Sequence, residues 1–307
     1  MSPVALRTDV GSVRLRNPVL TAAGTSGHGA ELARYFDLSS IGAVVVKSLA
    51  PEPWPGNPPP RVHPLSVGML NSVGLQGPGV ARWLEEELPA LERCGARVVV
   101  SIWGRRVEDF AKAASMLALA PECVVAVEVN VSCPNVEDRD RMFAHSASAT
   151  AEVLAATGDA QRPRWAKLSP NVANLVEIAG AALAGGAEAL TLTNTVLGLA
   201  LDLERRRPVL GAGGGGLSGP AVHAVAVRAV WDCHRAYPSA PIVGVGGVFS
   251  GEDAIELLMA GASAVQVGTA TLAEPRAPAR VLAELTAWCE RHDVDDVTDL
   301  IGGASAD

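Results

Sequence analysis

Residues 241–268, PIVGVGGVFSGEDAIELLMAGASAVQVG, contain one complete strand–helix–strand unit. Apolar runs at 241–245 and 264–267 enclose an amphipathic stretch at 251–260. Short apolar runs without alternation are typical of parallel strands that are buried on both faces. Ser250 and the acidic residues that follow it predict the start of the helix. This stretch therefore predicts two buried parallel strands connected by a helix.

The same alternation of short apolar runs and amphipathic stretches continues along the whole chain. We expect strands at 18–22, 43–47, 97–102, 124–131, 164–168, 189–194, 241–245 and 264–267. We expect helices at 80–94, 107–119, 149–156, 172–184, 220–236, 251–260 and 277–291. This alternation favours the α/β class with a closed (β/α)8 TIM barrel, and a doubly wound open sheet is the alternative. Residues 1–307 should form a single domain with a long Pro/Gly-rich insertion, interpreted as a functional loop, at about 50–79.

The composition is globular and excludes several classes of function. Among 307 residues, 49% are hydrophobic and 19% charged, and a net charge of -8 argues against a general nucleic-acid surface. Five cysteines without a CxxC pair predict no disulfide framework, iron–sulfur cluster or other metal site, and they fit a reducing cytoplasm. No run resembles a signal peptide or approaches the ~20 apolar residues of a membrane span, so no membrane association is expected.

Polar side chains follow the predicted strands. The active site of a (β/α)8 barrel lies at the C-terminal ends of its strands, so these side chains should converge on one pocket. They belong to Lys47, Ser48, Ser101, Asn130, Ser132, Cys133, Lys167, Ser169, Asn194 and Thr195, and the last two strands lead into Gly246, Gly247, Gly268 and Thr269.

The glycines after the seventh and eighth strands predict a site for a phosphate-bearing cofactor. The alternative is two tight turns that need glycine. Because no GxGxxG follows the first strand, FMN is favoured over a dinucleotide. Only three of the 25 basic residues are lysines, and Lys47 and Lys167 at strand ends suit a cation beside the flavin ring. Lys112 lies in a helical pattern and is interpreted as a surface charge.

Asparagines near the strand ends suit a flat substrate that carries both N–H and C=O groups, such as a pyrimidine. These are Asn71, Asn130, Asn135 and Asn194, whereas Asn171 and Asn174 are interpreted as turn or cap residues. Cys133 lies in a Ser-Cys-Pro-Asn run just after the fourth strand, where a thiol could act chemically. The other cysteines, Cys94, Cys123, Cys233 and Cys289, lie in helical or connecting patterns and are interpreted as structural.

Eight short motifs follow one another along the chain: GNPPPR at 56–61, GMLNSVGLQ at 68–76, EVNVSCPN at 128–135, KLSPNV at 167–172, TNT at 193–195, GGLSGP at 215–220, VGGV at 245–248 and VGT at 267–269. In this order they resemble the motifs of the class 1 dihydroorotate dehydrogenases. Gln76 makes the chain similar to class 1B. The resemblance implies oxidation of dihydroorotate to orotate in pyrimidine biosynthesis. It also implies FMN, an iron–sulfur flavoprotein partner that passes electrons to NAD, and a homodimer or heterotetramer.

The resemblance also implies roles for individual residues. Cys133 would be the catalytic base. Substrate would contact Lys47, Asn71, Ser72, Val73, Gly74, Leu75, Asn130, Asn194 and Thr195. FMN would contact Ala23, Gly24, Lys47, Ser48, Ser101, Asn130, Lys167 and Thr193, with its phosphate at Gly219, Gly246, Gly247, Gly268 and Thr269.

The chain departs from the family pattern at a few positions. Ala23 replaces a usual serine, Ser101 a usual asparagine and Ala200 a usual arginine, and the segment 136–144 is unusually charged. These differences keep open an FMN oxidoreductase that acts on another pyrimidine or small ring acid. A third alternative is a barrel without a flavin, either non-catalytic or a sugar-phosphate isomerase or aldolase.

Overall fold

The computed structural model describes residues 3–132 and 142–305. Its centre is an eight-stranded parallel sheet in the order β3-β16-β15-β10-β9-β8-β7-β4. The strands are β3 (Val19–Thr21), β4 (Val44–Val45), β7 (Val98–Ile102), β8 (Val124–Asn130), β9 (Arg164–Leu168), β10 (Ala189–Leu192), β15 (Ile242–Val245) and β16 (Ala264–Val267). All eight predicted strands are present, and β9 and β16 have the predicted bounds.

The sheet closes into a barrel between its first and last strands. Leu20 and Ala43 form a parallel bridge, and the Thr21 N–H donates to the Ala43 carbonyl over 3.2 Å. The closure consists of these few contacts because β4 is short. Together with the surrounding helices, this closure confirms the (β/α)8 barrel and excludes the open-sheet alternative.

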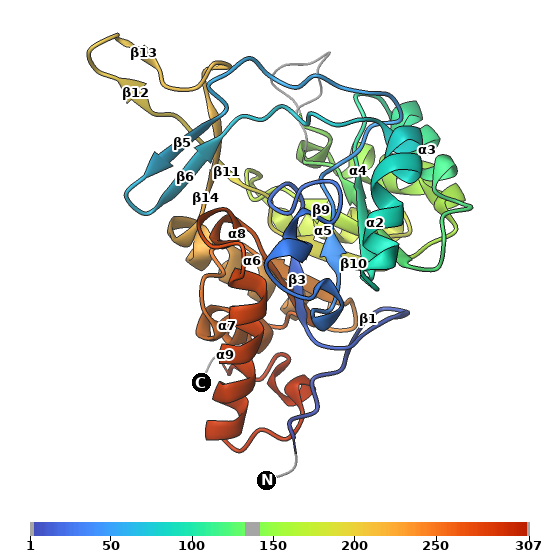
Figure 1. The fold of residues 1–307 in the computed structure, drawn as a ribbon, viewed down its shortest axis with the longest axis vertical. Helices are drawn as coiled ribbons and strands as arrows, with labels where there is room; N and C mark the ends of the chain where they lie inside the picture. The colour runs from blue at the N-terminus through green and yellow to red at the C-terminus, as the bar shows by residue number, and fades with distance from the viewer. Residues whose placement is uncertain (1–2, 133–141, 306–307) are drawn as a thin grey trace.

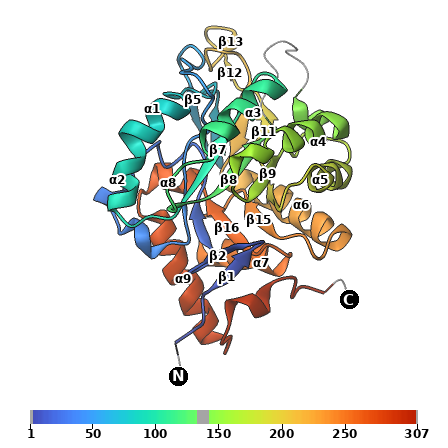
Figure 2. The same cartoon turned by 90° about the vertical axis from the view of Figure 1, so that its right-hand side faces the viewer.

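The N-terminal end of the barrel is apolar and sealed. The hairpin of β1 (Thr8–Val10) and β2 (Val13–Leu15) lies below the barrel strands (Figure 2). Its apolar side chains pack with inward-facing barrel residues in one buried cluster, which comprises Val10, Val13, Leu15, Leu20, Ala43, Val45, Val99, Ala126, Trp165, Ala189, Val243 and Ala264. A ligand can therefore reach the inward-facing polar side chains only from the C-terminal end of the barrel.

Helices surround the barrel as the alternating pattern predicts. They are α1 (Val80–Arg82), α2 (Leu88–Arg93), α3 (Val107–Met116), α4 (Ala147–Ala156), α5 (Leu175–Ala184), α6 (His223–Ala236), α7 (Gly251–Met259), α8 (Thr269–Ala273) and α9 (Ala277–Arg291). Short helical turns are η1 (Glu31–Arg34), η2 (Leu38–Ser40), η4 (Phe143–His145), η5 (Gly158–Ala160), η6 (Pro220–Val222) and η7 (Val297–Leu300). No helix in the described ranges is long and apolar enough to span a membrane.

One predicted helix, 80–94, is wrong as a single α-helix. A π-helical segment, η3 (Trp83–Glu87), separates α1 from α2. Pro89 occupies the first turn of α2 and has no N–H to donate to the preceding turn. The regular hydrogen-bond ladder is therefore interrupted at this point, and the helix continues only after the wider turn.

The insertion at 50–79, interpreted as a loop, contains two strands. These strands, β5 (Val62–Leu65) and β6 (Gly68–Asn71), join β14 (Gly215–Ser218) and β11 (Val196–Gly198) in the order β11-β14-β6-β5. A hairpin of β12 (Leu201–Asp202) and β13 (Arg207–Pro208) projects beside this sheet (Figure 1). Pro64 is tolerated because β5 is an edge strand. The pairing of β6 with β14 is long-range, so local pattern does not predict it.

Candidate functional site

A continuous chain of polar side chains crosses the C-terminal mouth of the barrel. Ser48 Oγ lies 2.9 Å from Ser101 Oγ, and Asn130 Nδ2 donates to Ser48 Oγ over 3.3 Å. Asn194 Nδ2 donates to Ser132 Oγ over 2.9 Å and lies 3.3 Å from Asn130 Oδ1. These side chains extend from the ends of β4, β7, β8 and β10. The structure thus brings Ser48, Ser101, Asn130 and Asn194 together, as predicted.

Lys167 lies below this network inside the barrel. Its Nζ donates to Gln266 Oε1 over 3.1 Å and lies 3.9 Å from Glu128 Oε1. Burial lowers the pKa of Lys167, and the negative charge of Glu128 partly opposes that change. Sequence reasoning found Lys167 but missed Glu128 and Gln266. The available signal was a charged or amide residue inside an otherwise apolar strand.

Lys47 and the turn after β3 form one side of the mouth. Lys47 is half-buried just beyond β4, and its Nζ lies 3.0 Å from the position that a Cβ on Gly24 would occupy. Gly24 has φ +90°, so it provides both the turn and the space for the lysine. Ala23 precedes it and is half-buried. Burial lowers the pKa of nearby His28, and the charge of Lys47 lowers that pKa further.

Asn71 and Thr195 lie on either side of one glycine. Asn71 Nδ2 donates to the Gly216 carbonyl over 3.3 Å, and a Cβ on Gly216 would lie 2.0 Å from Thr195 Oγ1. The Thr195 N–H donates to Asn194 Oδ1 over 2.8 Å, which links this pair to the polar network. Asn171 Nδ2 donates to the Thr195 carbonyl over 2.9 Å, so Asn171 does more than form the predicted turn. Asn174 caps α5, as predicted.

The predicted substrate-lining run Ser72, Val73, Gly74 and Leu75 forms an irregular segment after β6. Gly74 and Leu75 have φ values of +73° and +61°, a conformation that is unfavourable for leucine. Asn57 Nδ2 donates to Ser72 Oγ over 2.9 Å, and Arg61 Nε donates to the Asn57 carbonyl over 2.6 Å. Asn57 and Arg61 therefore anchor the start of this segment at Ser72, although sequence reasoning gave them no role.

Glycines form a narrow cradle beside α6 and α8. Gly219, Gly246 and Gly247 have φ values of +96°, +144° and +69°. A Cβ on Gly247 would lie 2.6 Å from His223 Cβ, and one on Gly219 would lie 2.7 Å from Gly68 Cα. A larger side chain at these positions would displace its neighbours, so glycine is required here. The structure also supports the tight-turn alternative, since both explanations require positive φ.

The remaining cofactor candidates border the cradle and the network. Thr269 Oγ1 donates to Ser218 Oγ over 2.8 Å, and a Cβ on Gly268 would lie 3.3 Å from Ala22 Cβ. Thr193 is buried, and its N–H donates to the Val245 carbonyl over 2.7 Å. The glycine cradle, hydroxyl groups and buried ammonium are groups that suit a flat, phosphate-bearing cofactor.

Cys133 and Asn135 lie outside the described residues. The other four cysteines are free: Cys233 and Cys289 are buried within α6 and α9, while Cys94 and Cys123 are half-buried beside α2 and β8. Burial and the neighbouring Asp232 raise the pKa of Cys233 to about 12. Lys112 forms an exposed ion pair with Glu52 over 2.6 Å, as its surface interpretation predicted. Within the described ranges, no group of acidic, His or Cys residues could hold a metal ion.

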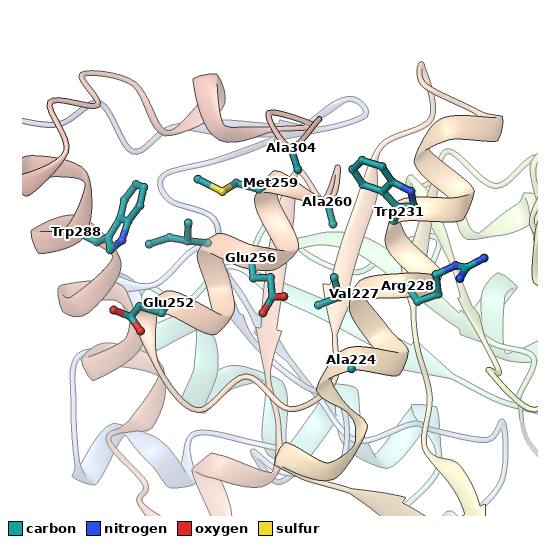
Figure 3. Close-up of a pocket in the computed structure, with 11 residues that line it drawn as sticks. Ala224, Val227, Arg228, Trp231, Glu252, Glu256, Met259, Ala260, Trp288 and Ala304 are labelled. Atoms are coloured by element: carbon teal, nitrogen blue, oxygen red, sulfur yellow. The ribbon is translucent and has the colours of Figure 1, made fainter. Parts of the chain in front are cut away.

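A groove of about 590 Å³ lies outside the barrel, between α6, α7 and α9. Figure 3 shows Trp231, Met259 and Trp288 around it, with Glu252 and Glu256 on α7. Its lining is mainly apolar, and none of the predicted site residues contributes to it. We therefore assign the candidate active site to the barrel mouth, where polar groups and a buried cation converge.

A polar mouth above a buried lysine, on a (β/α)8 barrel that is sealed at its other end, is the arrangement of a barrel enzyme with its active site at the C-terminal ends of the strands. The model of the family described as dihydroorotate dehydrogenase matches residues 5–288, and this chain belongs to that family. A relative from Alkaliphilus metalliredigens is 43% identical over 98% of this chain and 99% of its own length. A relative from Trichlorobacter lovleyi is 44% identical over 97% of this chain and 98% of its own length. Both are named dihydroorotate dehydrogenase B (NAD(+)), catalytic subunit.

Proposed function

We propose that this protein oxidises dihydroorotate to orotate, as the catalytic FMN subunit of a class 1B enzyme in pyrimidine biosynthesis. The observation that carries the proposal is the network of Ser48, Asn130, Ser132 and Asn194 above the buried Lys167. Family membership and the relatives' names support the same activity. A polar mouth of amides and hydroxyls above a cation matches a small, anionic, hydrogen-bonding ring.

The substrate ring would bind among the asparagines. Amides at Asn71, Asn130 and Asn194 can donate to ring carbonyls and accept from ring N–H groups. Lys47 would pair with the carboxylate, because it is the half-buried ammonium at the mouth. Thr195 would complete the pocket beside Asn194, to whose side chain its N–H donates. The segment 72–75, which directly follows Asn71, would line the same pocket.

Cys133 would act as the base that removes the proton from C5 of the substrate. The assignment rests on the Ser-Cys-Pro-Asn run and on the family resemblance, since the residue lies outside the described ranges. Ser132, one residue earlier, is buried at the end of β8. The Asn194 hydrogen bond fixes Ser132, the last described residue before Cys133, and this would favour a defined position for the base.

FMN fits the remaining groups of the mouth. When bound, it would supply the acceptor for the hydride from C6 of the substrate. Its phosphate would meet the backbone at Gly219, Gly246, Gly247, Gly268 and Thr269, and its ring would meet Lys167. Ala23, Gly24, Ser48, Ser101 and Thr193 would border the ring and ribityl chain. Gly24 leaves room for the Lys47 side chain and Gly247 for the start of α6 at His223, so a larger residue at either position would disturb the proposed cofactor site.

The electron acceptor and assembly follow from the same proposal. We propose an iron–sulfur flavoprotein partner that transfers electrons to NAD, because the relatives are named as NAD(+)-dependent catalytic subunits. The chain would act as one domain in a homodimer or a heterotetramer in the cytoplasm, where free thiols persist. Exposed leucines on β11 and on the projecting β12–β13 hairpin support association. Leu197, Leu199, Leu201 and Leu203 are all more than half exposed.

An anaerobic absorbance spectrum before and after addition of dihydroorotate tests the proposal. A yellow protein whose visible flavin band bleaches has both the cofactor and the reductive half-reaction. A protein that contains flavin but is not bleached by dihydroorotate would contradict the substrate. A colourless protein that FMN cannot reconstitute would contradict the cofactor as well.

One observation favours a second candidate function, which is the oxidation or reduction of a related ring acid by the same flavin. Ser101 replaces the family's asparagine, and its hydroxyl is already engaged with Ser48 Oγ over 2.9 Å. The shorter side chain changes the polar lining of the mouth. Titration with orotate separates the two candidates, because the first predicts tight binding with a perturbed flavin spectrum and the second predicts neither.

A further inference from the structure

Three charged or amide side chains from three different strands meet inside the barrel. Glu128 on β8 and Gln266 on β16 have no exposed surface, and Lys167 on β9 is 6% exposed. Gln266 Oε1 accepts from Lys167 Nζ over 3.1 Å, while Gln266 Nε2 donates to Glu128 Oε2 over 2.8 Å. The amide is therefore a bridge that satisfies the cation with one end and the carboxylate with the other.

The geometry is poor for a purely stabilising ion pair. Lys167 Nζ lies 3.9 Å from Glu128 Oε1, and this oxygen has no hydrogen-bond partner among the described residues. Removing a carboxylate and an ammonium from water costs several kcal/mol per ion, and a long contact recovers only part of that cost. Apolar side chains, such as those of the buried cluster at the N-terminal end of the barrel, would fill the same space more favourably. A functional reason for the three polar groups is therefore needed.

The position of the group supplies that reason. Lys167 is directly beside Asn130 in the β8–β9 register, and its own carbonyl lies 3.0 Å from Ser132 Oγ. Gln266 and Glu128 therefore hold the ammonium of a residue that lies beside Asn130 of the polar mouth. Burial lowers the pKa of Lys167 and favours the neutral amine, whereas the negative charge of Glu128 favours the ammonium.

We propose that Glu128 and Gln266 are positioning residues that hold Lys167 in its charged form at the proposed flavin site and would thereby raise the reduction potential of the bound cofactor. The proposal rests on the proposed FMN function for its second half. Its first half, the control of Lys167 by the other two side chains, concerns only this chain. A cation beside the flavin favours the reduced, anionic ring, so losing its charge makes the flavin harder to reduce.

The first experiment measures the charge of Lys167 directly. The chain contains three lysines, so 15Nζ-lysine labelling gives a small set of side-chain signals, and Lys167→Met identifies the signal of interest. We expect Glu128→Gln to lower the pH at which this signal titrates by at least one unit. The matched control is Thr191→Val, because Thr191 is a buried barrel residue beside Lys167 whose hydroxyl has no hydrogen-bond partner among the described residues. An unchanged titration in Glu128→Gln would overturn the positioning role.

The second experiment measures the flavin. Glu128→Gln should lower the midpoint potential of the bound flavin over the pH range in which only the variant has lost the lysine charge. Gln266→Met, a milder change if Glu128→Gln folds poorly, should shift the potential in the same direction. Potentials equal to wild type in both variants, with FMN bound, would overturn the second half of the proposal. A protein that binds no flavin would instead contradict the proposed function, while the lysine titration would still decide the first half.

Discussion

Asn194 Nδ2 donates a hydrogen bond of 2.9 Å to Ser132 Oγ, the hydroxyl of the residue directly before Cys133. This contact joins the end of β10 to the end of β8, across the strand β9 that lies between them. Ser132 Oγ also lies 3.0 Å from Asn130 Oδ1 and 3.0 Å from the Lys167 carbonyl. The side chain that is proposed to bind substrate therefore also holds the backbone from which the proposed base extends.

Asn194→Ala should weaken substrate binding and slow proton removal together. The change removes one proposed substrate contact and leaves Ser132 without the Asn194 donor. Loss of one or two such hydrogen bonds corresponds to about 1.5–3 kcal/mol, or roughly 10- to 100-fold in orotate affinity. Spectral titration of the flavin with orotate measures this. Asn174→Ala is the control, because it caps α5 away from the network; equal orotate affinity in both variants would contradict the assignment.

Cys133→Ala should retain FMN and lose turnover by at least about 100-fold, the usual contribution of a general base. Cys133→Ser should keep part of the rate, with its optimum at higher pH, because a hydroxyl releases its proton less readily than a thiol. Stopped-flow reduction of the flavin by dihydroorotate at several pH values checks both variants. Normal turnover in Cys133→Ala would show that another group is the base.

Gly247→Ala should reduce FMN affinity at least about 10-fold. The new Cβ would lie 2.6 Å from His223 Cβ at φ +69°, so the backbone must shift within the proposed phosphate cradle. Fluorescence titration of the flavin-free protein with FMN gives the dissociation constant. The matched control is Gly158→Ala, where a Cβ meets nothing within 4 Å. Unchanged FMN binding in Gly247→Ala would favour the tight-turn interpretation of the glycines.

Cys233 should make the protein less stable as pH rises above 9. Burial raises the pKa of this thiol from 9.0 to about 12, so the folded state keeps a proton that the unfolded chain releases in this window. Each pH unit therefore costs at most about 1.4 kcal/mol of unfolding free energy, and nothing is lost below pH 9. Urea unfolding of wild type and Cys233→Ala should show stabilities that converge from pH 9 upward. Parallel curves would contradict the prediction, and Cys94→Ala, at a half-buried position, serves as control.

Leu203→Ser combined with Leu201→Ser should weaken self-association at least about 10-fold. These side chains are 82% and 55% exposed on the projecting β12–β13 hairpin, and burying a leucine contributes about 1.5–3 kcal/mol. Sedimentation velocity over a concentration series measures the effect. Leu119→Ser removes an equally apolar, 94% exposed side chain near α3 and should leave association unchanged. If the Leu201/Leu203 double variant associates as strongly as Leu119→Ser, the β12–β13 hairpin is not the contact surface.

Local sequence pattern predicted most of the barrel and many residues of its mouth. Buried parallel strands require short apolar runs, and a polar residue at the end of each run stands out, as Lys47, Asn130 and Asn194 do. Glycines with positive φ, such as Gly247, are similarly visible because few other residues tolerate that backbone. These features depend on residues a few positions apart, so the amino-acid sequence by itself determined them.

Tertiary structure alone decided which distant residues meet. Glu128 and Gln266 are 138 positions apart, and only closure of the barrel turns a carboxylate and an amide within apolar strands into a bridge to Lys167. The pairing of β6 with β14, which brings Asn71 to Gly216, has the same origin. Hydrophobic periodicity reports burial, but it carries no information about the partner across the barrel, because that partner is selected by register and closure of the whole sheet.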